Sequence, residues 1–325
     1  MNGNIKEIYT INLAGLIVDV HIDNTFEKIK DFINRFGNND NKNRDTKLRI
    51  SFLKGSDRKL ELSEKWDSLS IIGDNIDDLS DPFNLIGITQ AIFRFTAIHL
   101  ATRGIFLLHG SAAILDNKIV CFGDDGNSTA KTLGSLEAAL ESGHYVADEF
   151  CFFDIKTQKI SGYPFIPIHI RPIVKNHLKY SHNLIVPKDD YKVTGAGEFI
   201  TQEKIFETVS GNLNTLAYIH FSDKDAILER LSQKEAYKSF KFCIASHIAK
   251  LLYPSLDRMR FASMTDTDEV KVIDEKTIDD ILSKIMINNE ISPQILERFD
   301  SYKLTVSHPC QIVPLLKKEM SRVFP

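Results

Sequence analysis

The chain has 325 residues, of which 43% are hydrophobic and 26% are charged, and its formal net charge at pH 7 is −4. This length accommodates one large α/β domain and a smaller one, and the slightly acidic balance argues against nucleic acid as a partner. No run of about 20 apolar residues is present and the N-terminus lacks a signal peptide's basic and apolar regions, so we expect a cytoplasmic protein without membrane contact.

The cysteines stand far apart in the sequence, mostly within apolar runs, and show no metal-ligand spacing. This pattern predicts reduced thiols in or near the core of a cytosolic protein rather than a disulfide framework. The four residues are Cys121, Cys151, Cys243 and Cys310.

The first part of the chain predicts a small N-terminal α/β domain over residues 1–80. Apolar and polar residues alternate in 16–22 (LIVDVHI), which is typical of a strand, and apolar residues recur at helical spacing in 26–36. A further strand is predicted over 48–53, after the polar segment 37–46.

A second domain is expected over residues 81–325. Asp81 and Pro82 predict the start of a long helix, because Asp is a good cap and Pro is tolerated in the first turn. The helix should end at Gly104, and since it is apolar on nearly all sides we expect it to be buried.

Two apolar runs, 112–115 and 119–122, follow on either side of Asp116 and Asn117. This arrangement predicts a hairpin with a tight turn. Further strands and helices alternate along the chain, and with hairpins also present we expect a mixed sheet. The expected elements are a helix over 133–142 ending at Gly143, strands over 145–154 and 216–221, an extended segment over 160–170, a mostly helical segment over 222–252 with Asp223 as its cap, a short strand over 303–307 and a final helix over 309–323.

The segment between the strand 119–122 and the helix 133–142 has the layout of a phosphate-binding loop. In such loops, backbone N–H groups converge on phosphate oxygens, and small residues let the backbone approach closely. Lys131 would then reach the terminal phosphates, and the Thr132 hydroxyl would bind magnesium. The residues expected to bind the nucleotide are Gly123, Gly126, Asn127, Ser128, Thr129, Ala130, Lys131 and Thr132.

The loop departs from the usual pattern G-x-x-x-x-G-K-[ST], which would place glycines where Asp125 and Ala130 stand. Its glycines are Gly123 and Gly126, so the loop looks longer than usual. Carboxylates repel phosphates, so Asp124 and Asp125 either point outward or hold a metal. The competing interpretation is an ordinary turn that contains Lys-Thr before a helix.

Asp148 and Glu149 follow the apolar residues 145–147. Proteins with phosphate-binding loops place an acidic residue at the end of a neighbouring strand to hold magnesium. The competing interpretation is a solvated strand end.

The segment 105–154 resembles the superfamily of HPr kinase/phosphorylase and phosphoenolpyruvate carboxykinase, and especially its HPr-kinase-related branch, which includes kinases from peptide-modifying gene clusters. The residues that carry the resemblance occur in the order and at the spacing typical of the family: His109, Ser111, Lys131-Thr132, Gly143 and Asp148-Glu149. The resemblance implies a mixed-sheet, carboxykinase-like nucleotide-binding core after a small N-terminal α/β domain. Glu149 replaces the second Asp of the family's pair, and no C-terminal signature of HPr kinase is found, so HPr is not predicted as the substrate.

The resemblance also implies roles for individual residues. Lys131 should contact the β and γ phosphates, and Thr132, Asp148 and Glu149 should hold Mg²⁺. Asp148 should act as the general base for the accepting hydroxyl, or as an outer magnesium ligand. His109 should lie near the phosphates; the alternative is a core histidine bonded to a backbone carbonyl.

Arg171 follows two prolines on an extended segment and completes the expected catalytic set. A guanidinium there could stabilise the charge of the transferred phosphate. The alternative is a salt bridge to a surface acid.

These observations predict a kinase that uses ATP or another nucleoside triphosphate with Mg²⁺. It would transfer the γ-phosphoryl group to a hydroxyl of a peptide, a protein or a small molecule, and the resemblance leaves room for a homo-oligomer. The alternative is a non-catalytic nucleotide-binding regulatory or scaffold protein with a degenerate loop. A carboxykinase is disfavoured because the chain is short and shows no second set of metal ligands.

Overall fold

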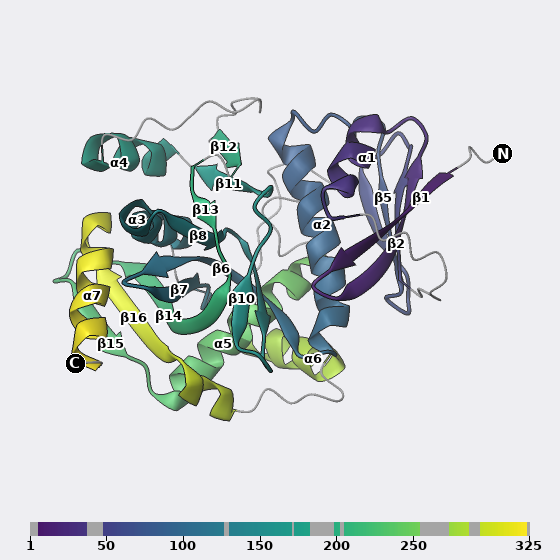
Figure 1. Cartoon of the computed structure of the whole chain (residues 1–325). Coiled ribbons are helices and arrows are strands. Elements are labelled where there is room, and N and C mark those ends of the chain that lie inside the picture. Colours follow the sequence, from purple (N-terminus) through teal and green to yellow (C-terminus); the bar gives the residue numbers. More distant parts are fainter. Residues whose placement is uncertain are drawn as a thin grey trace. The chain divides into compact units, whose positions relative to one another are not determined.

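The computed structural model describes residues 6–37, 48–126, 130–170, 172–182, 198–201, 205–253, 273–285 and 293–323. It confirms a mixed α/β protein (Figure 1). The described chain divides into two compact units, the first containing 6–37, 48–100 and 250–253 and the second containing the rest. The division falls after Leu100, whereas the sequence analysis placed it after residue 80, so nearly all of the long helix groups with the N-terminal unit.

The first unit is built on a mixed sheet whose strands, among the described residues, follow the order β1-β2-β3-β5-β4. β1 and β2 form an antiparallel hairpin, β2, β3 and β5 run parallel, and β4 is antiparallel to β5. The elements are β1 (Lys6–Leu13), β2 (Leu16–Asp23), α1 (Glu27–Asn34), β3 (Arg49–Leu53), β4 (Lys59–Leu62), β5 (Ser68–Ile72) and α2 (Pro82–Ala101).

The two helices of the first unit follow the sequence pattern. α1 buries Ile29, Phe32 and Ile33, as expected from their helical spacing. The side chains of α2 are buried on almost every side, and the chain leaves this helix through Gly104, whose φ of 78° suits a residue without Cβ. No described helix is long and apolar enough to span a membrane.

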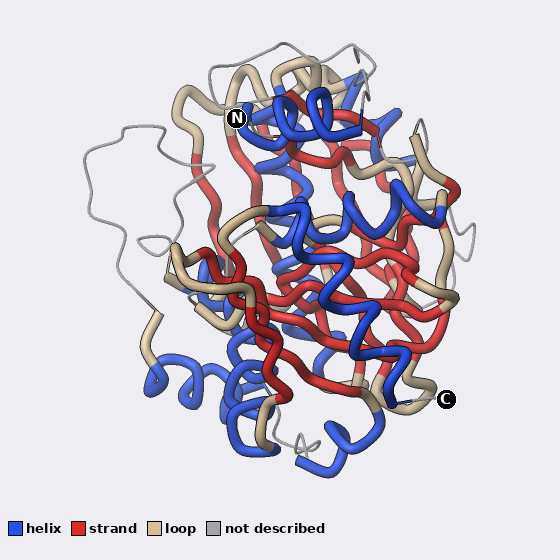
Figure 2. Tube along the Cα trace, turned by 90° about the vertical axis from the view of Figure 1, so that its left-hand side faces the viewer, coloured by secondary structure: helices blue, strands red, loops and turns tan. Residues whose placement is uncertain are grey.

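The second unit contains a larger mixed sheet in which, among the described residues, the strands follow the order β13-β8-β6-β9-β10-β14-β16-β15 and β7 lies between β6 and β14. The strands run side by side as the red tubes of Figure 2. They are β6 (Ile105–Leu115), β7 (Lys118–Gly123), β8 (His144–Ala147), β9 (Phe150–Asp154), β10 (Lys159–Ser161), β13 (Glu207–Thr208), β14 (Gly211–Phe221), β15 (Ile227–Arg230) and β16 (Asp300–Val306), with β11 (Pro167–Ile170) and β12 (Glu198–Thr201) as a separate pair.

Two long strands, β6 and β14, organise this sheet because each changes partner along its length. β6 pairs with β9 over 105–109 and with β7 over 110–115. β14 pairs first with β10, then with β7 and β16. β7 therefore lies between the two long strands, and the loop that follows it leaves from the middle of the sheet.

Helices cover both faces of this sheet. Along β7, Phe122 packs against α3, whereas a methyl group added at Gly123 would lie 3.3 Å from the Cys243 Sγ of α5. Successive strand residues point to opposite faces, so α3 and α5 belong to different layers. The helices of this unit are α3 (Lys131–Ser142), α4 (Pro172–His182), α5 (Gln233–Leu252), α6 (Glu275–Ile285) and α7 (Ile312–Val323), with the 3-10 segments η3 (Pro293–Arg298) and η4 (Pro309–Gln311).

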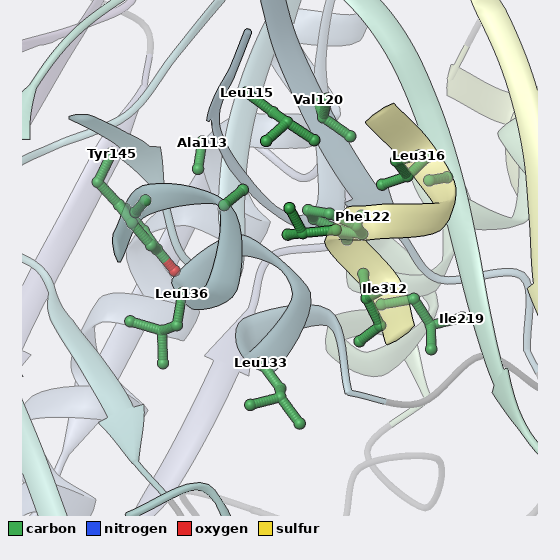
Figure 3. Packing of buried hydrophobic residues seen from close by; sticks show 14 of the residues in the cluster. Ala113, Leu115, Val120, Phe122, Leu133, Leu136, Tyr145, Ile219, Ile312 and Leu316 are labelled. Carbon is green, nitrogen blue, oxygen red and sulfur yellow. The ribbon is translucent and has the colours of Figure 1, made fainter. Parts of the chain in front are cut away.

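The core on the α3 side joins elements that are distant in sequence (Figure 3). Leu133 and Leu136 of α3, Phe122 of β7, Ile219 of β14 and Leu316 of α7 are all buried in one cluster. This burial holds the first turn of α3 against the end of β7, which is where the predicted phosphate loop lies.

Several local predictions are confirmed. β6 and β7 form the expected hairpin, and Asp116 and Asn117 have φ values of 48° and 60°, as the two-residue turn requires. α3 ends at Gly143, whose φ is 79° and whose N–H donates to the Ala139 carbonyl. The last helix buries the expected apolar face, Ile312, Val313, Leu316 and Met320.

The expected helix over 222–252 is wrong in its first part. Residues 227–230 form β15, which pairs antiparallel with β16, and α5 begins only at Gln233. Ser232, not Asp223, lies at the start: the Glu235 carboxylate accepts a hydrogen bond from the Ser232 N–H at 3.0 Å, and the Glu235 N–H donates to Ser232 Oγ at 3.4 Å. This reciprocal capping box sets the helix boundary.

The cysteine prediction is confirmed for three residues. Cys121, Cys151 and Cys243 are buried free thiols, whereas Cys310 is a free thiol at the surface.

The predicted extended segment 160–170 contains β10 and β11, which belong to different sheets.

Gly134 allows α3 to approach the sheet closely. A methyl group added there would lie 2.6 Å from Ile219 Cδ1 and 2.8 Å from Phe122 Cδ1. We expect Gly134→Ala to lower the free energy of unfolding by about 1–3 kcal/mol through overpacking, although helix propensity alone would raise it by about 1 kcal/mol. Urea unfolding would measure the change, and a more stable variant would contradict this packing.

Candidate functional site

The loop between β7 and α3 has the backbone that a close-packed turn requires. Gly126 has a φ of 91°, and a methyl group there would lie 2.9 Å from the Phe242 ring. Ala130 takes the left-handed conformation, with φ of 57°, directly before α3 begins at Lys131. The predicted ligands Asn127, Ser128 and Thr129 lie outside the described residues, so the structure describes only the two ends of the predicted phosphate loop.

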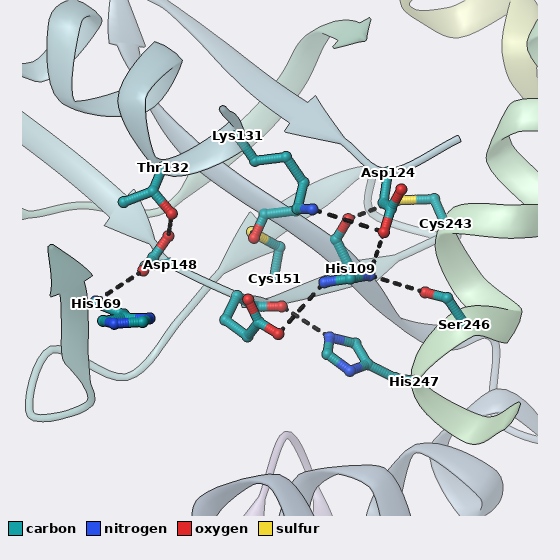
Figure 4. Close-up of polar contacts among 12 residues, drawn as sticks. His109, Asp124, Lys131, Thr132, Asp148, Cys151, His169, Cys243, Ser246 and His247 are labelled. Atoms are coloured by element: carbon teal, nitrogen blue, oxygen red, sulfur yellow. Dashed lines mark hydrogen bonds and ion pairs between the residues drawn. The ribbon is translucent and has the colours of Figure 1, made fainter. Parts of the chain in front are cut away.

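The start of α3 meets the end of β8 through a hydrogen bond from Thr132 Oγ1 to Asp148 Oδ1 at 2.9 Å (Figure 4). These two residues were predicted as magnesium ligands, and the structure brings them together. The Asp148 Oδ2 atom lies 3.4 Å from the backbone N–H of His169, which donates to it.

A buried group of three hydroxyls lies behind this contact. The Tyr145 hydroxyl lies 2.7 Å from both Ser111 Oγ and Ser135 Oγ, and the two serines contact each other. Ser135 also donates to the Thr132 carbonyl at 3.0 Å, and Ser111 to the Ala147 carbonyl at 3.3 Å. Because these residues come from β6, α3 and β8, the group locks Thr132 and Asp148 in their relative positions.

The prediction of one continuous strand over 145–154 is wrong. Asp148 and Glu149 interrupt it and separate β8 from β9. Glu149 has a φ of 64°, which is unusual for a residue with a side chain. In a straight strand, neighbouring side chains would point to opposite faces. The break instead brings both carboxylates to the same site, where Asp148 contacts Thr132 and Glu149 contacts His109.

Burial makes Asp148 an unusual carboxyl group. Removal from water and, to a lesser extent, the nearby charge of Glu149 raise its pKa, the hydrogen bonds from Thr132, Ser111 and His169 oppose the rise, and the resulting pKa is about 6. A carboxyl group with a pKa near neutrality can accept and release a proton under physiological conditions.

His109 lies at the centre of a second set of contacts (Figure 4). It is buried, its Nδ1 lies 2.7 Å from Asp124 Oδ2 and 3.1 Å from Ser246 Oγ, and its Nε2 lies 3.3 Å from Glu149 Oε1. Within the described part of the chain, both ring nitrogens of His109 contact side chains rather than a backbone carbonyl. It ties the loop acid Asp124 to the strand-break acid Glu149.

The two acids of the loop point inward rather than outward. Asp124 Oδ2 also lies 3.6 Å from Lys131 Nζ, and its Oδ1 accepts the Gly126 N–H at 2.9 Å. Burial alone would raise the pKa of Asp124, but His109, Lys131 and the Gly126 N–H lower it well below its ordinary range. Asp125 Oδ2 lies 3.0 Å from His220 Nε2, so each loop carboxylate faces a basic side chain.

Three side chains of this site were not found by sequence reasoning. Ser246 and His247 come from α5, and His220 comes from β14. The Nε2 atom of His247 donates a hydrogen bond to the Glu149 carbonyl oxygen at 2.8 Å, because a carbonyl oxygen can only accept. These residues have no characteristic spacing to the loop, and only the topology brings them to it.

Two groups of residues could hold a cation here. Thr132 and Asp148 offer adjacent oxygen atoms, the ligands that Mg²⁺ prefers, and so fit the predicted metal. Glu149 was predicted to join them, but its carboxylate groups with His109 and His247, whose ligand atoms lie within 4.8 Å of one another. Nitrogen ligands suit borderline metals better than Mg²⁺.

The predicted catalytic Arg171 lies outside the described residues.

Comparison of the chain with protein-family models and with curated proteins finds no match.

The raised pKa of Asp148 predicts how the free energy of unfolding depends on pH. A carboxyl that is protonated more readily in the folded than in the unfolded state favours folding less as the pH rises from about 4 through about 6. Asp148→Asn should therefore raise the free energy of unfolding at pH 8 by up to about 3 kcal/mol, and much less at pH 4. Urea unfolding at both pH values would measure this.

Asp116→Asn, in the exposed β6–β7 turn, controls for the exchange of Asp for Asn. Equal effects of Asp148→Asn at the two pH values would show that Asp148 is not held in a costly charged form.

Proposed function

We propose that this chain is a nucleotide-dependent phosphotransferase with a carboxykinase-like core of the HPr-kinase-related type. The observation that carries the proposal is the hydrogen bond between Thr132, at the start of α3, and the buried Asp148, at the end of β8. A hydroxyl directly after a lysine, joined to an acid from a neighbouring strand, is the arrangement with which phosphate-binding loops hold Mg²⁺ beside a nucleotide.

The residues of the site have separate tasks in this proposal. Lys131 contacts the terminal phosphates, and the N-terminus of α3 contributes the positive end of its dipole. Thr132 would hold Mg²⁺, with Asp148 as an outer ligand, and the bound ion would supply positive charge for the developing charge of the phosphoryl group. ATP or another nucleoside triphosphate is the donor.

Asp148 takes the proton of the accepting hydroxyl. In the metal-free protein its pKa of about 6 leaves it mostly ionised at neutral pH, yet makes it a stronger base than an exposed carboxylate. The acceptor is a hydroxyl of a peptide, a protein or a small molecule. Phosphoryl transfer depends mainly on position and charge, so one well-placed base suffices.

His109 acts as a positioning residue rather than as an acid or base. Its two ring nitrogens lie against Asp124 and Glu149, so it fixes the positions of both carboxylates. In its protonated form it would also neutralise part of their charge. The predicted contribution of Arg171 stays a prediction.

One observation favours the alternative, a nucleotide-binding regulatory or scaffold protein without catalysis. Lys131 Nζ lies 3.6 Å from Asp124, so the lysine already has an anionic partner in the loop. A nucleotide must compete with that carboxylate for Lys131, and the competition weakens binding or changes the position of the phosphates.

Binding tests the site assignment. We expect a non-hydrolysable ATP analogue to bind in the presence of Mg²⁺, and Lys131→Ala to weaken this binding by at least about tenfold, because a charge-assisted contact to phosphate is lost. Isothermal titration would measure it, with Lys317→Ala as the control, since Lys317 is on α7 and pairs with Glu141. Equal affinities of wild type and Lys131→Ala would contradict the assignment.

Phosphoryl transfer separates the kinase from its alternative. We expect Asp148→Asn to keep nucleotide binding but to lower the release of ADP from ATP by about 10²–10⁴-fold, because the base is lost. The regulatory role would be favoured if the wild-type protein binds the nucleotide with Mg²⁺ but does not transfer phosphate. The acceptors tested are water and hydroxyl-bearing peptides and metabolites. Unchanged ADP release by the variant would show that Asp148 is not the base.

A further inference from the structure

A second group of metal-binding side chains lies on the same unit but away from His109 and Asp124. It consists of Glu137 on α3 and of His177 and His182 on α4. We propose that these three residues form a zinc site that links α3 to α4. The proposal does not depend on the phosphotransferase function.

The geometry points to a shared ligand. The Nε2 atoms of both histidines contact the same atom, Glu137 Oε1, that of His182 at 2.8 Å and that of His177 closer still. The ligand atoms of the three residues all lie within 4.8 Å of one another. Neighbouring ligand atoms of a tetrahedral zinc ion are about 3.4 Å apart. Small side-chain rotations would therefore open enough space for the ion between them.

The exposure of the three side chains is that of a metal site in which one coordination position is open to solvent. The side chains of Glu137 and His177 are 6% and 8% exposed, whereas that of His182 is 32% exposed. The first two ligands are thus shielded, and the third lies at the surface, where an ion can enter and a water molecule can complete the tetrahedron. Three protein ligands and one open position are typical of zinc sites that exchange their fourth ligand.

Charge supplies the energetic reason for an ion. A buried carboxylate is costly unless a positive partner compensates it. A protonated imidazole would supply this charge to Glu137 alone, whereas a divalent cation would bring charge together with direct bonds to all three ligands. Two nitrogen ligands and one oxygen ligand suit Zn²⁺ better than Mg²⁺ or Ca²⁺, which prefer oxygen.

The position of Glu137 would couple the ion to the nucleotide loop. Glu137 lies on α3, whose first residues are Lys131 and Thr132, and Leu136 beside it is part of the buried cluster. His182 is the last residue of α4. An ion bound by all three residues would therefore fix the C-terminal end of α4 against the helix that carries the phosphate-binding lysine.

The competing explanation is a metal-free group in which both imidazoles donate hydrogen bonds to Glu137. The test uses the full-length protein, stripped with a chelator and titrated with Zn²⁺ against a chromophoric competitor. We expect one equivalent to bind to the wild type and to raise its melting temperature, since an ion that binds only the folded state stabilises it.

The variants locate the ion. Glu137→Gln and His182→Ala should each weaken Zn²⁺ binding by more than about tenfold and abolish the rise in melting temperature, because each removes one ligand. His182 is the most exposed of the three, so His182→Ala is the variant best able to fold. His144→Ala is the matched control, because His144 belongs to the same unit and contacts Glu207 instead.

The His109–Glu149–His247 group is the rival zinc site, and His247→Ala tests it. Retained binding in His247→Ala with loss in His182→Ala would support the proposal. The reverse pattern, or a wild-type protein that binds no Zn²⁺, would overturn it. Nucleotide binding by His182→Ala is measured as well. If this variant still binds the ATP analogue, loss of the zinc site does not depend on the phosphotransferase site.

Discussion

The hydrogen bond between Thr132 and Asp148 is the contact on which the rest of the candidate site depends. It joins the first turn of α3 to the end of β8, and the buried hydroxyls of Ser111, Ser135 and Tyr145 keep the two elements at this separation. Without it, the lysine before Thr132 would belong to an ordinary helix start. With it, a hydroxyl and a buried carboxylate are in contact directly beside Lys131 in the chain, and these are the groups that the proposed phosphoryl transfer uses.

The second constraint is the number of carboxylates at this site. Asp124 and Asp125 in the loop and Asp148 and Glu149 at the strand break all belong to it, and like charges in a poorly solvated place are unfavourable. Basic side chains lie against three of these acids. His109 lies between Asp124 and Glu149, Lys131 also lies beside Asp124, and His220 lies beside Asp125. Asp148 instead accepts hydrogen bonds from the Thr132 hydroxyl and the His169 N–H, and the pKa of its carboxyl is raised, whereas that of Asp124 is lowered. The charge balance therefore distinguishes Asp148 from Asp124.

Sequence reasoning found much of the site because many of its members are close along the chain. Lys131, Thr132 and Asp148 follow from a loop pattern and a strand end, and the structure places Thr132 against Asp148 and Lys131 against the loop acid Asp124. It failed for Ser246, His247 and His220, which reach the site from α5 and β14. It also missed Glu137, His177 and His182, because the two histidines lack the i, i+4 spacing that marks a metal site on a single helix.

What the sequence by itself determined is local: the turn at Asp116 and Asn117, the end of α3 at Gly143, and the buried faces of α1 and α7. These depend on backbone preferences and periodicity within a few residues. Only the tertiary structure decided that the strand breaks at Glu149, that helix α5 starts late at Gln233, and that His109 lies between two acids. The physical reason is that these features arise from packing and charge compensation between segments far apart in the chain, which no local pattern records.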